Sequence, residues 1–159
     1  MAPITTTIEV ASPSAEVFDY VTDPTRFAEW QHNVVGGHMD TDGPIAAGTK
    51  CLTTRKIGFA EREVTSEVTH IDPPRTWGVY GVDGPIRATV NVTVDPLDDG
   101  RRSRLTIAVD FEGHGIGKLI VPLAVRRQAR NEMPRNLQAV KERLEDPDPP
   151  RSAPGNPTA

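Results

Sequence analysis

Strict alternation of apolar and polar residues is the dominant pattern of this chain. It begins at residues 4–10 and recurs between residues 33 and 112, in segments separated by turns that contain glycine and proline. A period of two residues is typical of half-buried strands, and turns at such short intervals are typical of antiparallel ones. The pattern predicts strands at 4–10, 33–41, 49–57, 60–71, 76–82, 86–96 and 102–112, each with one dry and one wet face.

Two short helices are predicted between the first and second strands. Ser12 can accept a backbone amide of a first helical turn, and Pro13 suits the first helical position. Asp23-Pro24 repeats this start signal, and Trp30 belongs to the apolar side of the second helix.

The segment from residue 116 to about residue 145 is predicted to form a long helix that covers the dry face of the sheet. Its buried stripe recurs at steps of three and four residues, as a helix requires. The stripe consists of Pro122, Arg126, Ala129, Met133, Leu137, Val140 and Leu144. Because Pro122 and Pro134 each remove a helical hydrogen bond, bends are expected at both positions.

The length of 159 residues fits one domain. Residues 147–159 are rich in proline and hold no large hydrophobic residue, so we expect a folded domain over 1–146 and a disordered tail. The net charge of -4 disfavours nucleic acid as a partner, because phosphate binding needs a concentrated positive field.

Targeting signals are also missing from the pattern. No stretch approaches the ~20 apolar residues that cross a bilayer, and the N-terminal residues lack the charged and apolar regions of a secretion signal. We therefore expect a cytoplasmic protein without membrane insertion. A homodimer is compatible with the sequence, although nothing in it indicates one.

Several segments, taken with this order of elements, form a pattern that is known from other proteins. They are residues 8–18, Asp23-Pro24 leading to Trp30, Gly43-Pro44 with Gly48-Thr49, residues 67–75 and residues 137–145. The pattern resembles the START-like (SRPBCC, helix-grip) superfamily, most closely its polyketide cyclase/dehydrase branch. The resemblance implies an α+β fold in which a curved seven-stranded antiparallel sheet wraps a long C-terminal helix. It also implies an enclosed small hydrophobic molecule, without naming it.

His70 is the most prominent candidate for chemistry. The alternation of residues 60–71 places it on the same face as Val64 and Val68, which predicts that it points toward the pocket. Because imidazole titrates near neutrality, His70 could polarise a ligand carbonyl or move a proton. The other interpretation is a structural histidine bonded to a neighbouring backbone group.

Four further side chains could contact a ligand. Trp30 and Trp77 offer flat surfaces for a ring, or else they fill the core. Arg55 and Arg126 could bind a carboxylate or phenolate if they point inward, and are otherwise exposed. The predicted ligand-binding set is Trp30, Arg55, Val68, His70, Trp77, Val79, Val90, Val92, Arg126, Ala129 and Met133.

No metal or cofactor is expected. The four histidines lie on separate segments without the short spacing of zinc ligands. Cys51 is the only cysteine, which excludes an internal disulfide, and it is predicted to be a small buried residue.

Two functions of different classes remain open at this point. One is a binding protein or cyclase-like enzyme for an aromatic or polyketide-like molecule, and the other is a non-catalytic carrier or sensor of a lipid or similar hydrophobe. A catalyst needs polar groups that converge in the pocket, whereas a carrier needs an apolar lining with one polar anchor. The apolar inward faces favour binding, and the sequence leaves open whether any reaction takes place.

Overall fold

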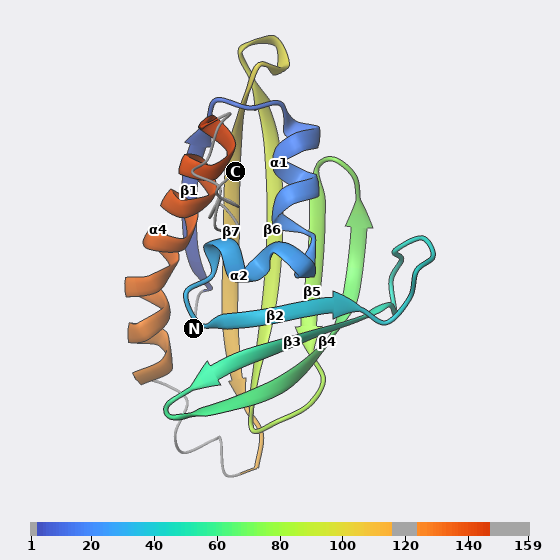
Figure 1. Ribbon diagram of the computed structural model, residues 1–159, viewed down its shortest axis with the longest axis vertical. Helices are drawn as coiled ribbons and strands as arrows, with labels where there is room; N and C mark the ends of the chain where they lie inside the picture. The colour runs from blue at the N-terminus through green and yellow to red at the C-terminus, as the bar shows by residue number, and fades with distance from the viewer. Residues whose placement is uncertain (1–2, 116–123, 147–159) are drawn as a thin grey trace, which may run out of the picture.

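The computed structural model describes residues 3–115 and 124–146 and places twelve elements in these ranges (Figure 1). In chain order they are β1 (Ile4–Val10), α1 (Ser14–Val21), η1 (Pro24–Arg26), α2 (Phe27–Trp30), β2 (Val34–Met39), β3 (Lys50–Ile57), β4 (Ala60–Asp72), β5 (Thr76–Gly81), β6 (Ile86–Leu97), η2 (Asp98–Gly100), β7 (Arg102–Gly113) and α4 (Ala124–Glu145). The predicted strands and short helices are confirmed. The predicted helical residues 116–123, the bend at Pro122 and the tail from residue 147 lie outside the described residues.

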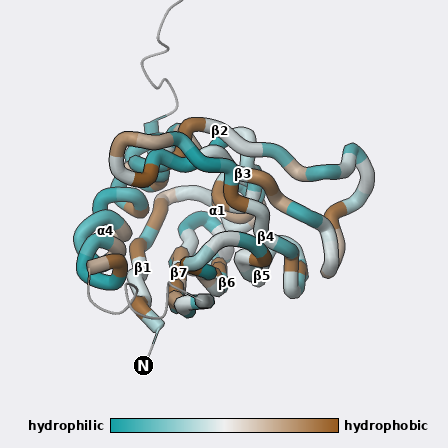
Figure 2. The backbone as a smooth tube through the Cα atoms, turned by 90° about the horizontal axis from the view of Figure 1, so that it is seen from below, coloured by the Kyte–Doolittle hydropathy of each residue, from teal (hydrophilic) through white to brown (hydrophobic). Residues whose placement is uncertain are grey.

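The seven strands form one antiparallel sheet in the order β1-β7-β6-β5-β4-β3-β2, so that β1 and β2 are its edges. Figure 2 shows the sheet curling from β1 round to β2, with α4 on its open side. This is the predicted helix-grip arrangement. The curl gives the sheet a concave inner face, and the apolar side chains of the alternating strands line it.

Helix α4 is packed unevenly along its length. Leu137 and Val140 in its second half are almost wholly buried, in the same core as Val10 and Leu105. In its first half Val125 is only half-buried. The C-terminal half therefore packs tightly on the sheet, whereas the N-terminal half buries Arg126 and Met133 but leaves Val125 and Ala129 half-buried. Figure 1 shows this half diverging from β1.

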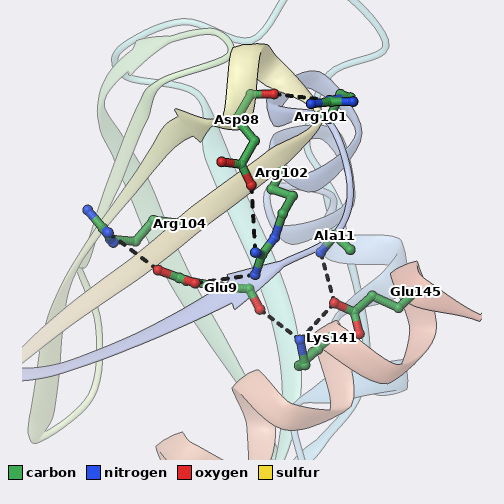
Figure 3. A network of polar contacts seen from close by, with 8 residues as sticks. All are labelled: Glu9, Ala11, Asp98, Arg101, Arg102, Arg104, Lys141 and Glu145. Carbon is green, nitrogen blue, oxygen red and sulfur yellow. Dashed lines mark hydrogen bonds and ion pairs between the residues drawn. The ribbon is translucent and has the colours of Figure 1, made fainter.

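A polar network fixes the C-terminal end of α4 to β1 (Figure 3). Lys141 Nζ donates to the backbone oxygen of Glu9 (3.0 Å) and to the carboxylate of Glu145 (2.7 Å). The same carboxylate oxygen of Glu145 accepts the backbone amide of Ala11 (2.8 Å). Because the Glu9 carboxylate pairs with Arg102 of β7 (3.3 Å), the network joins the helix to two neighbouring strands.

The start of α1 differs from the prediction. The residue before the helix is Pro13, in an extended conformation, and no side chain caps the first turn. Ser12 Oγ instead donates to the carboxylate of Glu16 (2.8 Å), so the capping role predicted for Ser12 is wrong. The second start signal is confirmed, since the carboxylate of Asp23 accepts the amide of Thr25 (3.0 Å).

A β-bulge in β4 overturns the predicted orientation of His70. Val68 pairs with Val79 and His70 with Gly78, so the residue between them has no partner of its own. An extra residue reverses the alternation of side chains beyond it. Ile71 therefore packs on the core while His70 is exposed on the outer face, where its ring covers Gly78.

Two adjacent glycines of β2 give the first prediction. A Cβ atom at Gly37 would lie 2.9 Å from the carbonyl oxygens of both Leu52 and Pro24, whereas one at Gly36 would meet nothing within 4 Å. Because backbone would have to move, we expect Gly37→Ala to lower the free energy of unfolding by ~1–3 kcal/mol. Gly36→Ala should change it by about 0.5 kcal/mol or less. Equal urea denaturation midpoints for the two variants would contradict the packing of β2 against η1.

The network in Figure 3 predicts a pH dependence of stability. The hydrogen bond from Lys141 is the largest effect and lowers the pKa of Glu145; burial raises it by less, and the amide of Ala11 lowers it further. A lowered folded-state pKa stabilises the protein above the ordinary carboxyl pKa of about 4.3, and this stabilisation is lost as the pH falls through the folded value.

Replacement of Glu145 by glutamine should therefore lower the melting temperature at neutral pH and have a smaller effect in acid. Thermal melts across this range check the expectation. Glu63→Gln is the matched control, because Glu63 is exposed and makes no ion pair among the described residues. If Glu145→Gln lowers the melting temperature as much in acid as at neutral pH, the charge of Glu145 is not the cause.

Candidate functional site

A cavity of about 350 Å³ lies between the inner face of the sheet and α4. This volume is at the lower end of the ~300–1,000 Å³ typical of small-molecule pockets. Strands β5, β6 and β7 supply most of its apolar wall through Val79, Val90, Val92, Ile107, Val109 and Phe111. Because the strands alternate, each places every second side chain on this wall.

Three aromatic residues form one part of the cavity wall: Phe27 and Trp30 of α2, and Trp77 of β5. The rings of Phe27 and Trp30 meet edge to face at 5.8 Å, and those of Phe27 and Trp77 meet at 6.3 Å. All three side chains line the cavity and are almost fully buried. Neither buried indole nitrogen has a hydrogen-bond partner among the described residues. This part of the wall therefore suits the face or edge of a ring.

Arg55 of β3 is a cation in the same wall. Its guanidinium donates to the hydroxyl of Thr53 (3.3 Å), to the amide oxygen of Asn33 (3.2 Å) and to that of Gln31 (3.3 Å). All three acceptors are neutral, and no carboxylate of the described residues is ion-paired with it. Three hydrogen bonds hold the orientation of the guanidinium, while the carboxylate of Glu132 acts on its positive charge without forming an ion pair with it.

The surroundings of Arg55 act on its charge. Burial lowers the pKa of Arg55, whereas Cys51 and Glu132 act in the opposite direction. Arginine stays protonated in proteins despite such a shift. The site therefore keeps a positive charge in a poorly hydrated place, where an arriving anion would be bound more strongly than in water.

Helix α4 adds a polar row to the cavity. Gln128, Glu132 and Asn136 follow one another at steps of four residues and all line the wall. Gln128 donates to the carboxylate of Glu132 (2.9 Å), and Asn136 accepts the backbone amide of His32 (3.2 Å). Glu132 is the only carboxylate that lines the cavity among residues 3–115 and 124–146. Arg55 can thus donate hydrogen bonds to a ligand, and Glu132 can accept them, within the same cavity.

The solvent-exposed members of the lining mark the mouth of the cavity. Lys56, Ile57 and Gly58 at the end of β3 are exposed, and so is Gln128 on α4. The mouth therefore lies between the β3–β4 hairpin and the first turns of α4. The aromatic residues lie deeper, since they are buried.

Most of the predicted ligand-binding residues line this cavity. They are Trp30, Arg55, Trp77, Val79, Val90, Val92, Ala129 and Met133. Three predicted residues lie elsewhere: Val68 is buried in the core, His70 is exposed outside the sheet, and Arg126 is buried beside β7.

Arg126 was a candidate ligand contact if it pointed inward and was otherwise expected to be exposed; it does neither, because it is buried in an ion pair with Asp110. The row of α4 that lines the cavity runs through Val125 and Ala129, at a step of four. Arg126 is one residue further along and so is turned by about 100° toward β7. Its carboxylate partner belongs to the protein and not to a ligand.

A protein-family model matches residues 1–145 of the chain. It describes proteins of polyketide cyclase/dehydrase and lipid transport type. The chain belongs to this family. The predicted resemblance to the polyketide cyclase/dehydrase branch is thereby confirmed.

Two solved structures illustrate the similarity of fold. The Zhui aromatase/cyclase from Streptomyces sp. R1128 has a TM-score of 0.72 at 15% identity over 90% of this chain and 93% of that one. A START superfamily protein from Mycobacterium smegmatis has a TM-score of 0.72 at 16% identity, covering 91% of this chain and 98% of its own. At these identities the likeness concerns the fold.

A curated relative is an uncharacterized protein of Mycobacterium tuberculosis. It is 32% identical over 71 residues, which are 44% of this chain and 32% of the relative. The chain thus matches about a third of the length of that relative.

Several lining residues of this polyketide cyclase/dehydrase family member were not predicted, chiefly the polar ones. The row Gln128, Glu132 and Asn136 runs at steps of four directly beside the predicted stripe, and this spacing could have identified it. Gln31 and Asn33 lie in the connection from α2 to β2, where no periodicity gives their direction.

Among residues 3–115 and 124–146, no cluster of histidine, cysteine, aspartate and glutamate could hold a metal ion, and no helix is long and apolar enough to cross a membrane. Cys51 is buried, and burial raises its pKa to about 11, which makes its thiol unreactive.

The cavity predicts a difference between two alanines of α4. Both are half-buried and pack against the core, but only Ala129 also lines the cavity. Phenylalanine at 129 has open space to occupy, so we expect a stability change below about 1 kcal/mol and a smaller cavity. Phenylalanine at 139 should cost ~1–3 kcal/mol, because that site is already filled. Chemical denaturation of both variants checks this, and a large loss for Ala129→Phe would show that the cavity is filled by side chains in solution.

Proposed function

We propose that this protein binds a small, largely apolar aromatic or polyketide-like molecule that carries one acidic or enolic oxygen. The observation that supports this most directly is Arg55, a cation in the cavity wall with neutral hydrogen-bond partners only. A buried charge is costly unless an opposite charge or good hydrogen bonds compensate it. A carboxylate, phenolate or enolate oxygen from the ligand would give Arg55 the direct ion pair that Glu132 does not make.

The rest of the wall fits the same kind of molecule. Rings of the ligand would stack against Phe27, Trp30 and Trp77, and the apolar strands would enclose these rings. Ring edges that carry hydroxyl groups would find an acceptor in Glu132. The aromatase/cyclase of similar fold supports a polyketide-like molecule, and the lipid transport members of the family support a hydrophobic one.

A cyclase or dehydratase reaction is the second candidate, because Arg55 and Glu132 line one cavity. In an enolisation, the arginine would stabilise the oxyanion that develops on a ketone while the carboxylate takes a proton from the neighbouring carbon. His70 takes no part in this proposal, since it lies outside the cavity. The carrier function needs Arg55 alone.

The binding proposal predicts charge selectivity at Arg55. For the unaltered protein we expect 2-naphthoate to quench the fluorescence of Trp30 and Trp77, and 2-naphthamide to bind more weakly. Arg55→Met should weaken the binding of 2-naphthoate by about 10- to 100-fold, since hydrogen bonds to charged groups contribute ~1.5–3 kcal/mol. The affinity of Arg55→Met for 2-naphthamide, which has no charge, should fall by less than about 3-fold.

Arg127→Met is the matched control, because Arg127 is an exposed arginine of α4 outside the cavity lining. It should leave both affinities unchanged. Equal losses for the acid and the amide in Arg55→Met would exclude an anion site at this residue. Absence of any binding to the unaltered protein would contradict the proposal as a whole.

A further inference from the structure

Glu132 of α4 is a half-buried carboxylate in the cavity wall, and its two oxygens differ in their surroundings. The side-chain amide of Gln128, one helical turn earlier, donates to Oε1 (2.9 Å). The Oε2 atom makes no hydrogen bond and no ion pair with the described residues. The wall therefore presents a carboxylate that is held on one side and can still accept a hydrogen bond on the other.

Arg55 lies within electrostatic reach of this carboxylate. Burial is the largest effect on the pKa of Arg55 and lowers it, whereas Cys51 and the charge of Glu132 oppose that shift. The two side chains nevertheless form no ion pair, and the hydrogen bonds of Arg55 go to neutral oxygens. Strand β3 and helix α4 thus hold opposite charges on the wall of one cavity without bringing them into contact.

The separation of these charges leaves both of them able to bind a ligand group. Opposite charges in poorly hydrated surroundings compensate each other fully only when they touch. A guanidinium has further N–H groups beyond the three that bond to Gln31, Asn33 and Thr53. Arg55 can therefore still donate, and Glu132 can still accept. A molecule that carries an anionic oxygen and a hydrogen-bond donor would satisfy both.

A ligand with an acidic group alone would match this wall less well. Its carboxylate would bind Arg55 but would also lie near Glu132, and like charges repel each other more strongly as they approach. A hydroxyl group that donates to Glu132 would replace part of this cost by a charge-assisted hydrogen bond, which is stronger than one between neutral groups. The effect of Glu132 on affinity thus depends on whether the ligand offers a donor.

We infer that Glu132 is a specificity-determining residue, which selects hydroxylated aromatic acids over acids that have no donor. The inference rests on the proposed anion site at Arg55 and narrows the class of its ligand. The carboxylate of the ligand binds Arg55, and a hydroxyl group elsewhere on its ring system donates to Oε2 of Glu132. Plain fatty acids lack such a donor, so the cavity suits a polyketide-like acid better than a simple lipid.

Calorimetric titration with 2-naphthoate and its monohydroxylated derivatives tests this inference. The derivatives are those whose hydroxyl group is not adjacent to the carboxylate, because an adjacent hydroxyl bonds to its own carboxylate. For the unaltered protein we expect at least one derivative to bind about fivefold or more tightly than 2-naphthoate, as a hydrogen bond to a charged group allows. If no derivative binds more tightly than 2-naphthoate, the inference is wrong.

Glu132→Met separates selection from a purely structural role, because methionine keeps the length of the side chain and favours helix. We expect the preference for the hydroxylated acid to fall below about twofold. The affinity for 2-naphthoate should rise by about two- to fivefold, since the repulsion between like charges is removed. A variant that keeps the preference, or that loses affinity for both acids alike, would overturn the inference.

Glu142→Met is the matched control. Glu142 is an exposed carboxylate of α4 outside the cavity lining, and it accepts the amide of Gln138 (3.3 Å) at the same spacing as Glu132 and Gln128. This variant should bind both acids like the unaltered protein. Absence of the hydroxyl preference would leave the anion site at Arg55 intact, whereas equal losses of acid and amide in Arg55→Met would remove the anion site and this inference together.

Discussion

The attachment of the second half of α4 to β1 is the interaction on which the cavity depends. Leu137 and Val140 are buried in the core, Lys141 donates to the backbone of Glu9 in β1, and Glu145 accepts the amide of Ala11, the residue that follows β1. With that end fixed, the curvature of the sheet leaves a space between its inner face and the row of the first half of the helix that holds Val125 and Ala129. The space that results is enclosed by apolar side chains, because both surfaces carry them at regular periods.

The position of Arg55 shows how this cavity accommodates a charge. A cation beside an apolar wall would be destabilising without partners. Gln31, Asn33 and Thr53 supply three neutral oxygens, which orient the guanidinium without cancelling its charge. A protein carboxylate in direct contact would weaken the attraction for an anion, as the ion pair between Arg126 and Asp110 of β7 illustrates.

The fold could be predicted because its signals are local and repeated. Alternation over each strand and the stripe of α4 determine which faces are dry, so Val79, Val90 and Ala129 were placed correctly in the wall. His70 was misplaced because a single extra residue in β4 reverses the alternation, and no residue type marks such a bulge. Arg126 was misplaced because a step of three and a step of four turn a helical side chain toward different neighbours.

The polar half of the site could not be predicted for a different reason. Arg55 is oriented by oxygens that lie 22 and 24 residues earlier in the chain, in a connection without periodicity. Such contacts exist only once the sheet has curled and brought α2 over the end of β3. The chemistry of the cavity is thus set by tertiary structure, whereas its shape is set by periodic sequence.

The uneven packing of α4 separates what holds the protein together from what selects its ligand. In the last turns Leu137 and Val140 are buried and Lys141 is bonded to the sheet, so substitutions of these residues act on the whole fold. Residues of the first turns, such as Val125, Gln128 and Ala129, face open space and can vary at little cost in folding. Ligand preference can therefore diverge during evolution, or be redesigned in the laboratory, by exchanging a few side chains in one half of a single helix.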